Sequence, residues 1–337
     1  MHKQRVRIVT YFLLYLAIAF AGWPAVSQVQ TAAGDRQPLF RIADSQLSPS
    51  PVVISYGDMR FTDPQETAAT NPKVRRWLVD AIAKEKPDAL LLGGDVVWHG
   101  QVANDYAEYE LETAPWRAAH IFISATLGNH ELNGDDQEKC LQNWWNAFTK
   151  LRGKRWYSVQ LGSKLFVLNL DSNSSLLPGS EQAKWLGEQL ASLLPSVKFV
   201  FLNLHHPPIA DPLPDPKEDV SPRPNEIALA EFLKTSARQK QARIIVNAAH
   251  VHNYERFLQD GVVYLVSGGG GAKPSAPPPR GSADLYQERS DPNYHYVKFV
   301  LHEDTIEAQM IRVADPLAET PRWEVKDRFQ VVSRQIK

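Results

Sequence analysis

Three apolar runs in the first half of this sequence each lead into a glycine followed by an acidic or amide side chain. The runs, at residues 51–56, 88–92 and 120–125, are short and aliphatic, as buried strands are. The polar residues after their glycines are Asp58, Asp95 and Asn129. Stretches with the apolar spacing of helices separate the runs, and this alternation predicts an α/β sheet that binds ligands at the carboxyl ends of its strands. A structural turn accounts for one such ending, but three in succession indicate a shared site.

Two later runs of the same kind lead into histidines. The run at 197–204 is followed by His205, and the run at 242–249 is followed by His250 and His252. In an extended segment the side chains of residues i and i+2 point to the same side, so His250 and His252 can face one point. A pair of ordinary surface histidines is the simpler interpretation of this motif alone. The prediction of a site therefore depends on partners from the other strand ends.

Collected at one edge of a sheet, these residues would form a metal-binding set. Carboxylate, amide and imidazole ligands suit Fe, Mn or Zn rather than calcium. A carboxylate that bridges two such ions about 3.5 to 4 Å apart would make a two-metal site for phosphoryl transfer. The glycines at 268–271 are not followed by a helix or by the Lys-Ser/Thr of a phosphate-binding P-loop. We interpret that stretch as a loop bordering the site.

The remaining pattern divides the chain into further elements. Helices are predicted at 72–86, 104–116, 180–194 and 226–238, hairpins at 157–171 and 296–311, and a strand at 262–267. Proline-rich stretches at 207–224 and 268–293 are predicted to be exposed loops that flank the site, and they carry no readable code for a substrate. The expected organisation is a linker at 28–50, a domain at 51–313, and a tail at 314–337 whose residues 323–331 could add an edge strand.

The first residues have the organisation of a targeting segment. Three basic residues precede an apolar run at 8–23, and small residues follow at the positions of a cleavage site that ends at Ser27. The run is shorter than the about 20 residues that a spanning helix needs. We therefore predict a signal peptide at 1–27 and an exported protein, periplasmic or secreted, without a membrane span. Retention of residues 8–23 as an uncleaved membrane anchor is the alternative.

Composition excludes some classes of function. The formal net charge is -1, so no basic field indicates nucleic-acid binding. Cys140 is the single cysteine of the chain, which excludes an internal disulfide framework. We expect a small-molecule substrate rather than a nucleic-acid partner.

Taken in order, the motifs resemble those of the calcineurin-like metallophosphoesterases. They are Gly57-Asp58, Gly94-Asp95, Gly128-Asn129-His130-Glu131, His205-His206-Pro207-Pro208 and His250-Val251-His252. The continuation of the last motif to Arg256 is most similar to the purple acid phosphatase branch, and the resemblance covers residues 51–270. It implies an α/β fold, namely a four-layer αββα sandwich with two mixed β-sheets packed face to face and helices outside. It also implies hydrolysis of a phosphate mono- or diester by a metal-activated hydroxide.

The resemblance assigns a role to each motif residue. Asp95 is expected to bridge two divalent or trivalent metal ions, and His130 is expected to assist protonation of the leaving group. The other ligands would be Asn129, His205 and His250 for the second metal and Asp58 and His252 for the first. Of the neighbouring residues, His206 is expected to be structural, and Glu131 is expected to orient His130.

Two positions depart from the family pattern. Arg60 stands where most of the family has a histidine ligand, and Trp98 stands where purple acid phosphatases have a tyrosine ligand. Arginine has no available lone pair and indole is only a donor, so neither is an ordinary metal ligand. We therefore expect a weak or empty first metal site, and we hypothesise that Arg60 supplies positive charge there and grips the phosphate. An ion pair between Arg60 and Asp58 is the alternative, and His99 is a less favoured substitute ligand.

A second hypothesis keeps the fold without the catalysis. The altered first site and the long proline-rich loops would suit a non-catalytic exported binding protein with a degenerate first metal site. The second-site residues and His130 argue for an enzyme instead, because a decayed site need not retain its acid.

Overall fold

Strand β2 (Val52–Tyr56) shows how the sequence builds the layers of this fold, which we describe from a computed structural model. Ser55 and Tyr56 point to opposite faces of the strand, because successive side chains of a strand alternate. The Ser55 hydroxyl donates a hydrogen bond to Asn247 of a second sheet, whereas the Tyr56 ring meets Trp116 of a covering helix with 6.0 Å between ring centroids. Both residues are buried, so this sheet lies between two other layers.

The structure describes residues 37–212, 222–239, 241–275, 280–288 and 294–334. The predicted signal peptide at 1–27 lies outside these ranges, and so do parts of the two predicted loops that flank the site. Among the described residues, no helix is both long enough and apolar enough to cross a membrane.

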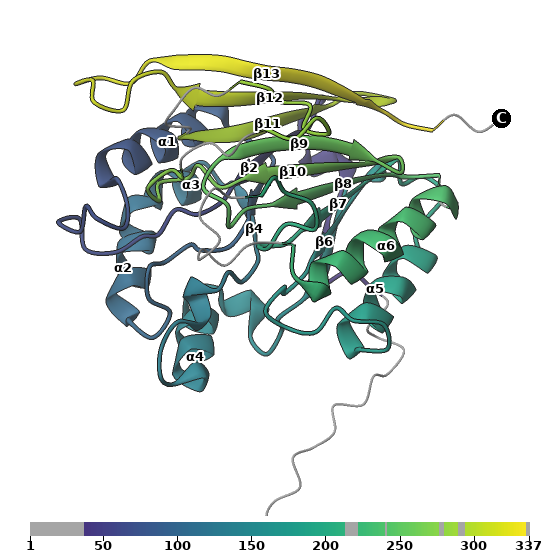
Figure 1. Cartoon of the computed structure of the whole chain (residues 1–337), viewed down its shortest axis with the longest axis horizontal. Coiled ribbons are helices and arrows are strands. Elements are labelled where there is room, and N and C mark those ends of the chain that lie inside the picture. Colours follow the sequence, from purple (N-terminus) through teal and green to yellow (C-terminus); the bar gives the residue numbers. More distant parts are fainter. Residues whose placement is uncertain (1–36, 213–221, 240, 276–279, 289–293, 335–337) are drawn as a thin grey trace, which may run out of the picture. The chain divides into compact units, whose positions relative to one another are not determined.

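Two mixed sheets form the centre of the fold (Figure 1). The six-stranded sheet has the order β13 (Trp323–Val332), β12 (Thr305–Val313), β11 (His295–Leu301), β2, β3 (Ala89–Leu92) and β4 (Phe122–Ala125). The seven-stranded sheet has the order β1 (Phe40–Ile42), β5 (Tyr157–Leu161), β6 (Leu165–Asn169), β7 (Phe199–Asn203), β8 (Arg243–Ala248), β10 (Val262–Ser267) and β9 (Tyr254–Gln259). Strands β2, β3 and β4 are parallel neighbours, and so are β6, β7 and β8. The two predicted hairpins, β5 with β6 and β11 with β12, are antiparallel pairs, and β13 is an edge strand.

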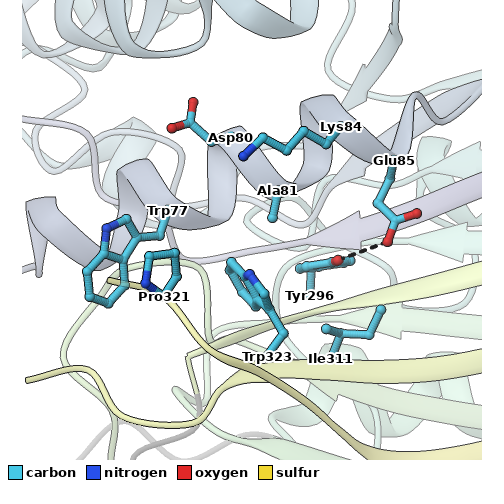
Figure 2. A pocket seen from close by; sticks show the side chains of 9 residues that line it. All are labelled: Trp77, Asp80, Ala81, Lys84, Glu85, Tyr296, Ile311, Pro321 and Trp323. Atoms are coloured by element: carbon cyan, nitrogen blue, oxygen red, sulfur yellow. Dashed lines mark hydrogen bonds between the residues drawn. The ribbon is translucent and has the colours of Figure 1, made fainter. Parts of the chain in front are cut away.

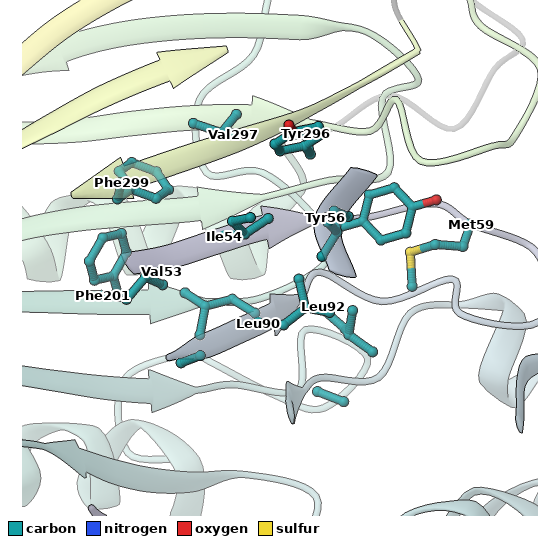
Figure 3. Close-up of a cluster of buried hydrophobic side chains, with 14 of the residues drawn as sticks. Val53, Ile54, Tyr56, Met59, Leu90, Leu92, Phe201, Tyr296, Val297 and Phe299 are labelled. Carbon is teal, nitrogen blue, oxygen red and sulfur yellow. The ribbon is translucent and has the colours of Figure 1, made fainter. Parts of the chain in front are cut away.

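The two sheets pack face to face across an apolar core. Phe201 of β7 and Phe299 of β11 meet edge to face, with 4.9 Å between ring centroids, and Figure 3 shows them beside Val53 of β2. All three side chains are fully or almost fully buried. Burial of a side chain of this size contributes about 1.5 to 3 kcal/mol, so this core holds the two sheets in a fixed relation.

Helices cover the outer faces of both sheets. On the six-stranded sheet lie α1 (Pro72–Glu85) and α3 (Ala114–Ala118), and the Trp116 indole donates to the Val79 carbonyl at 3.0 Å to join them. Helices α5 (Glu181–Ala191) and α6 (Pro224–Gln239) lie beside the seven-stranded sheet (Figure 1), where a second apolar cluster includes Leu186, Leu233 and Val200. The predicted four-layer αββα sandwich is confirmed.

Local sequence explains where the helices begin. The Asn71 side chain accepts a hydrogen bond from the Val74 amide at 3.1 Å at the start of α1, and Ser180 caps α5 in the same way. The predicted helix at 104–116 is instead two helices, α2 (Ala103–Glu112) and α3, because Pro115 cannot donate to a continuous helix.

Strand β9 and the two elements described next were not expected from the sequence. Helix α4 (Gln137–Ala147) follows the N-cap Asp136. In the expected linker at 28–50, β1 pairs in parallel with β5, and the Phe40 ring contacts Tyr157 at 5.8 Å. Strand pairing and the partly buried Phe40 ring therefore attach this stretch to the seven-stranded sheet.

A cavity of about 630 Å³ lies between α1 and strands β11–β13. Figure 2 shows it lined by Trp77, Tyr296 and Trp323, with the Tyr296 hydroxyl bonded to Glu85 at 3.2 Å. None of the predicted site residues lines this cavity, so the candidate chemistry lies elsewhere.

Candidate active site

The ends of five strands deliver the predicted site residues to one place. Asp58, Asp95 and Asn129 follow the parallel neighbours β2, β3 and β4 of one sheet. The histidines at 205, 250 and 252 follow β7 and β8, which are parallel neighbours in the other sheet. The site therefore lies where the carboxyl ends of the two sheets meet, as the sequence predicts.

A row of asparagines fixes the two sheets directly at these strand ends. Asn247 Nδ2 donates to Asn203 Oδ1 at 2.8 Å, and Asn203 Nδ2 donates to Asn169 Oδ1 at 3.0 Å and to the Leu92 carbonyl at 3.1 Å. All three asparagines are fully buried. Buried amides left without these partners would cost about 1 to 3 kcal/mol each, so the row holds the strand ends in register. The sequence carried a signal for it, since an asparagine closes or nearly closes each of the three strands.

Backbone strain is concentrated in the loops that carry the site. Asp58, Arg60, Asp95 and His250 have positive φ angles of 58, 50, 50 and 69°. Left-handed conformations cost a non-glycine residue about 1 to 2 kcal/mol, and surrounding contacts must hold them in place. The Asp58 amide donates to the Gly94 carbonyl at 3.1 Å, and the His250 amide donates to Asp58 Oδ2 at 2.8 Å.

Gly128 is required by a close approach of the loops. A Cβ atom at this position would lie 2.3 Å from both the Asp95 amide nitrogen and the Asp95 Oδ1 atom. Only glycine lets the Asn129 loop approach the Asp95 carboxylate this closely, which explains the glycine before Asn129.

Three potential ligands converge on the Oδ1 side of Asp95. His205 Nε2 lies 2.9 Å from Asn129 Oδ1, 3.1 Å from His250 Nδ1 and 3.2 Å from Asp95 Oδ1. His205 Nδ1 donates to the Gly93 carbonyl at 2.9 Å, which leaves the lone pair on Nε2 facing the cluster. This convergence is the arrangement expected for the second metal site.

The other oxygen of Asp95 faces positive charge and an imidazole. Arg60 Nη2 lies 3.4 Å from Asp95 Oδ2, and His130 Nε2 lies 3.7 Å from the same atom. The ion pair of Arg60 thus runs to Asp95 and not to Asp58, the partner considered in the alternative. The two carboxylate oxygens of Asp95 therefore have different surroundings.

Asp58 and His252 present two buried atoms that lack partners. Asp58 Oδ1 and His252 Nε2 lie 3.6 Å apart, and neither makes a hydrogen bond within the described residues. His252 Nδ1 donates to the Lys273 carbonyl at 2.9 Å, so a lone pair on Nε2 faces the Asp58 carboxylate. A bound cation would satisfy both atoms, and the pair therefore fits a metal ion.

Electrostatics at the centre of the site favour bound positive charge. Burial and the neighbouring Asp95 raise the pKa of Asp58 well above its usual range. Burial acts to raise the pKa of Asp95 as well, but His205, His130 and Arg60 outweigh it, so that this pKa lies below its usual range. Two buried carboxylates this close can be ionised together only when positive charge lies between or beside them.

Three further residues neighbour the predicted ligands. Glu131 accepts from the backbone amides of Asp95 at 2.9 Å, Val97 at 3.1 Å and Gly128 at 2.5 Å, so it ties two loops together rather than orienting the His130 ring as expected. His206 bonds Ser172 through Nδ1 at 2.8 Å, but its Nε2 atom lacks a partner within the described residues, and His206 groups with His205 and His250 as possible ligands of one metal ion. The expectation that His206 is structural therefore stays a prediction.

His99 is turned away from the candidate ligands. Its Nδ1 atom pairs with Asp105 at 3.3 Å, and 43% of the side chain is exposed. It therefore does not replace the missing first-site ligand.

A buried ion pair that sequence reasoning missed supports the Arg60 loop. Arg75 binds Glu112 through Nε and Nη2, at 3.1 and 2.5 Å, and its Nη1 atom donates to the Arg60 carbonyl at 2.9 Å. The Arg60 amide donates to the Asp95 carbonyl at 2.9 Å. The strained backbone of Arg60 is thus held from both sides.

The sequence matches one described family over more than half of its length. Residues 60–254 match the family described as calcineurin-like phosphoesterase. The match contains all the predicted site residues except Asp58, which lies two residues before it. No curated protein matches the chain in sequence.

Solved structures share the fold at low sequence identity. Purple acid phosphatase PPD1 from yellow lupin (Lupinus luteus) is 17% identical, with a TM-score of 0.67, over 85% of this chain and 54% of that chain. This chain thus spans about half the length of that protein. A dimetal phosphatase from Danio rerio is 14% identical, with a TM-score of 0.57, over 88% of this chain and 100% of that chain.

A third structure with the same fold is described by a different role. GAP50, the anchor in the inner membrane complex of Plasmodium, is 13% identical, with a TM-score of 0.53, over 86% of this chain and 90% of that chain. At these identities the likeness shows the fold alone, and the chemistry has to be argued from the residues at the strand ends.

Proposed function

Because the chain belongs to the calcineurin-like phosphoesterase family, we propose that it hydrolyses a phosphate mono- or diester of a small molecule at the strand-end site. Family membership supports a metallophosphoesterase, a hydrolase of phosphoric ester bonds, with a dinuclear metal centre. The observation that carries the proposal is the convergence of Asn129, His250 and Asp95 within 3.2 Å of His205 Nε2.

The residues at the strand ends fit two metal ions of the Fe, Mn or Zn class. The second ion would be held by Asp95, Asn129, His205 and His250, and the first by Asp58, Asp95 and His252. When bound, such ions activate water as a nucleophile and neutralise charge on the phosphoryl oxygens. The unpartnered atoms of Asp58 and His252 support this assignment, because a buried lone pair and a buried carboxylate oxygen otherwise lose their hydrogen bonds.

Arg60 is proposed to supply positive charge at a first site that is weak or empty. Its Nη2 atom lies 3.4 Å from Asp95 Oδ2, on the side of the carboxylate away from the second-site cluster. The Arg60 side chain is 15% exposed, and Nη2 is its only atom with a side-chain hydrogen-bond partner within the described residues, so the guanidinium retains donors for a phosphate oxygen. The strained backbone, held by Arg75 and Asp95, supports a functional rather than an incidental position.

His130 is proposed to assist departure of the leaving group. Its Nδ1 atom donates to the Trp98 carbonyl at 2.7 Å, which directs Nε2 toward Asp95 Oδ2 at 3.7 Å. A protonated Nε2 in this position can give its proton to the leaving oxygen while Arg60 binds a phosphoryl oxygen. No serine or cysteine nucleophile is needed for direct attack by water.

The proposal includes export of the protein. Its support is the sequence of residues 1–27, with three basic residues before an apolar run. Expression in the native host, followed by amino-terminal sequencing of extracytoplasmic protein, tests this. A mature chain that begins near residue 28 supports export, membrane-bound protein with residues 8–23 intact indicates an anchor, and cytoplasmic protein contradicts export.

A substrate assay with metal quantification tests the enzymatic proposal. Purified protein is loaded with Mn, Fe or Zn, its metal content is measured, and it is assayed on chromogenic phosphate monoesters and diesters. Metal-dependent turnover on at least one class is expected. Activity on neither class at full metal loading would contradict the proposal and favour the non-catalytic binding protein on the same fold.

A further inference from the structure

The structure assigns a positioning role to Trp98: we propose that its indole holds both Arg60 and His130 against the Oδ2 atom of Asp95. This inference rests on the proposed function, because Arg60 and His130 are the groups that would bind phosphate and protonate the leaving oxygen. Trp98 stands at the position where the branch that the chain resembles has a metal-ligating tyrosine. At this position the side chain therefore supports its neighbours by ring contacts instead of binding a metal ion.

The contact with His130 involves both the backbone and the ring of Trp98. The Trp98 carbonyl accepts a hydrogen bond from His130 Nδ1 at 2.7 Å. The two rings stack with 4.4 Å between centroids and 19° between planes. The carbonyl holds one proton on Nδ1, so the proton that His130 would give to the leaving oxygen is a second one, on Nε2 of the imidazolium. The stacked ring limits rotation of the imidazole. Together they aim His130 Nε2 at Asp95 Oδ2.

The contact with Arg60 is a cation–π interaction. The guanidinium carbon lies 4.6 Å from the centroid of the Trp98 ring. The same guanidinium reaches Asp95 Oδ2 through Nη2 at 3.4 Å. An arginine side chain has about four rotatable bonds, and ordering it costs conformational entropy that the indole face offsets. Without the ring, the guanidinium would be held at this point only by Asp95 Oδ2 and could adopt other rotamers.

Core packing alone does not explain this tryptophan. Trp98 is only partly buried, unlike Trp116 and Trp144, which are fully buried in the apolar core. Its ring contacts are instead to the two charged or titratable side chains at Asp95 and to His99, which lies at a T-shaped angle 5.3 Å away. Removal of the indole should therefore disturb the site more than the fold.

Three variants separate a positioning role from a structural one. Trp98→Leu removes the aromatic face, Trp98→Phe keeps a smaller face, and Trp185→Leu removes a partly buried tryptophan of α5 outside the site. Each is assayed on aryl phosphate esters of the class that the wild type accepts, from 4-nitrophenyl to phenyl. Inhibition by inorganic phosphate, metal content and thermal unfolding are measured for each.

Leaving-group dependence is the readout that a merely structural role would not change. A poorer leaving group needs its proton more, so Trp98→Leu should lose about tenfold more turnover on the phenyl ester than on the 4-nitrophenyl ester. Its inhibition constant for phosphate should rise about fivefold as Arg60 loses its support. Trp98→Phe should restore most of the turnover and most of the phosphate affinity, with unchanged metal content. If Trp98→Leu does not fold, Trp98→Phe still tests the inference.

Defined results would overturn the inference. An equal loss on all esters with an unchanged phosphate constant, a profile matching Trp185→Leu, or loss of bound metal in both Trp98 variants would each contradict it. Failure of the proposed function looks different, because the metal-loaded wild type would then hydrolyse none of the esters.

Discussion

The two oxygens of the Asp95 carboxylate differ in how many potential metal ligands lie near them. On the Oδ1 side, Asn129, His205 and His250 lie within 3.2 Å of one another in a connected cluster. The predicted first-site ligands Asp58 and His252 form a separate pair, with 3.6 Å between Oδ1 and Nε2, and on the Oδ2 side Arg60 contacts the Asp95 carboxylate. The same carboxylate therefore faces a complete ligand set on one side and a fixed cation on the other.

Under the proposed function, this difference indicates how a two-metal fold can hydrolyse phosphate esters after one metal ligand has been replaced. A phosphoryl-transfer site needs positive charge on both sides of the transferred group, and a guanidinium can provide part of that charge without coordination. Arginine is always protonated, so its charge does not depend on metal supply. Under the proposed function, the Oδ1 side would carry the metal chemistry and the Oδ2 side would bind the phosphate.

The largest expected effect comes from breaking the complete side. His205→Ala removes the residue at the centre of the cluster, and turnover should fall by about a thousandfold or more as the second-site metal is lost. Metal content and turnover are measured together. His252→Ala is the matched first-site control and should lose distinctly less metal and less turnover. An equal or larger loss in His252→Ala would reverse the comparison.

The next effect should come from removing the proposed acid without touching either metal site. His130→Ala should keep its metal and lose about a hundredfold or more of its turnover on an aryl phosphate. Metal analysis of the variant separates this result from the loss expected for His205→Ala. Unchanged turnover would refute the role of His130.

A smaller effect should come from Arg60. In Arg60→Ala the Michaelis constant should rise by about tenfold, because a charge-assisted contact to phosphate is lost while the second-site ligands stay in place. Arg60→Lys keeps the charge but not the planar fork, and it should recover only part of the loss. Full recovery in Arg60→Lys would show that charge alone matters, and an unchanged Michaelis constant in Arg60→Ala would refute phosphate binding.

The smallest effect concerns stability on the first-site side. Burial raises the pKa of Glu255, which follows His252 in one segment, to about 8 from an ordinary 4.5. The unfolded chain releases this proton first, so Glu255 should lower the stability of the fold progressively as the pH rises from about 4.5 to about 8, by at most about 1.4 kcal/mol per pH unit. Urea unfolding of the wild type and Glu255→Gln at about pH 5 and about pH 8 measures the difference; a difference that does not change with pH would contradict a buried, protonated Glu255.

Strand-end chemistry could be predicted from the sequence because it is local. A glycine after an apolar run, followed by Asp58, Asp95 or Asn129, identifies both the strand and the edge at which the side chain emerges. The four layers followed from the resemblance carried by these motifs. The departures at Arg60 and Trp98 could also be read directly, since neither residue type is an ordinary ligand.

The remaining features depend on contacts between segments that are distant in the sequence. The pairing of Arg60 with Asp95 instead of Asp58 follows from loop backbones held by Arg75 and Glu112. The tie made by Glu131 across two loops cannot be inferred from its place beside His130. Strand β1 was missed because it is only three residues long and takes its burial from the neighbouring strand β5. Helix α4 did carry a local signal, the N-cap Asp136 followed by Cys140 and Trp144 at helical spacing, which sequence reasoning did not use.

Metal stoichiometry tests the central claim most directly. The wild type and Arg60→Ala are purified, exposed to excess Mn, Fe or Zn, passed through a desalting column, and analysed for metal per chain. The account predicts one tightly held ion in the wild type, and its loss in a His205→Ala control. Two tightly held ions per chain in both the wild type and Arg60→Ala would contradict it, because Arg60 would then stand beside a complete two-metal centre.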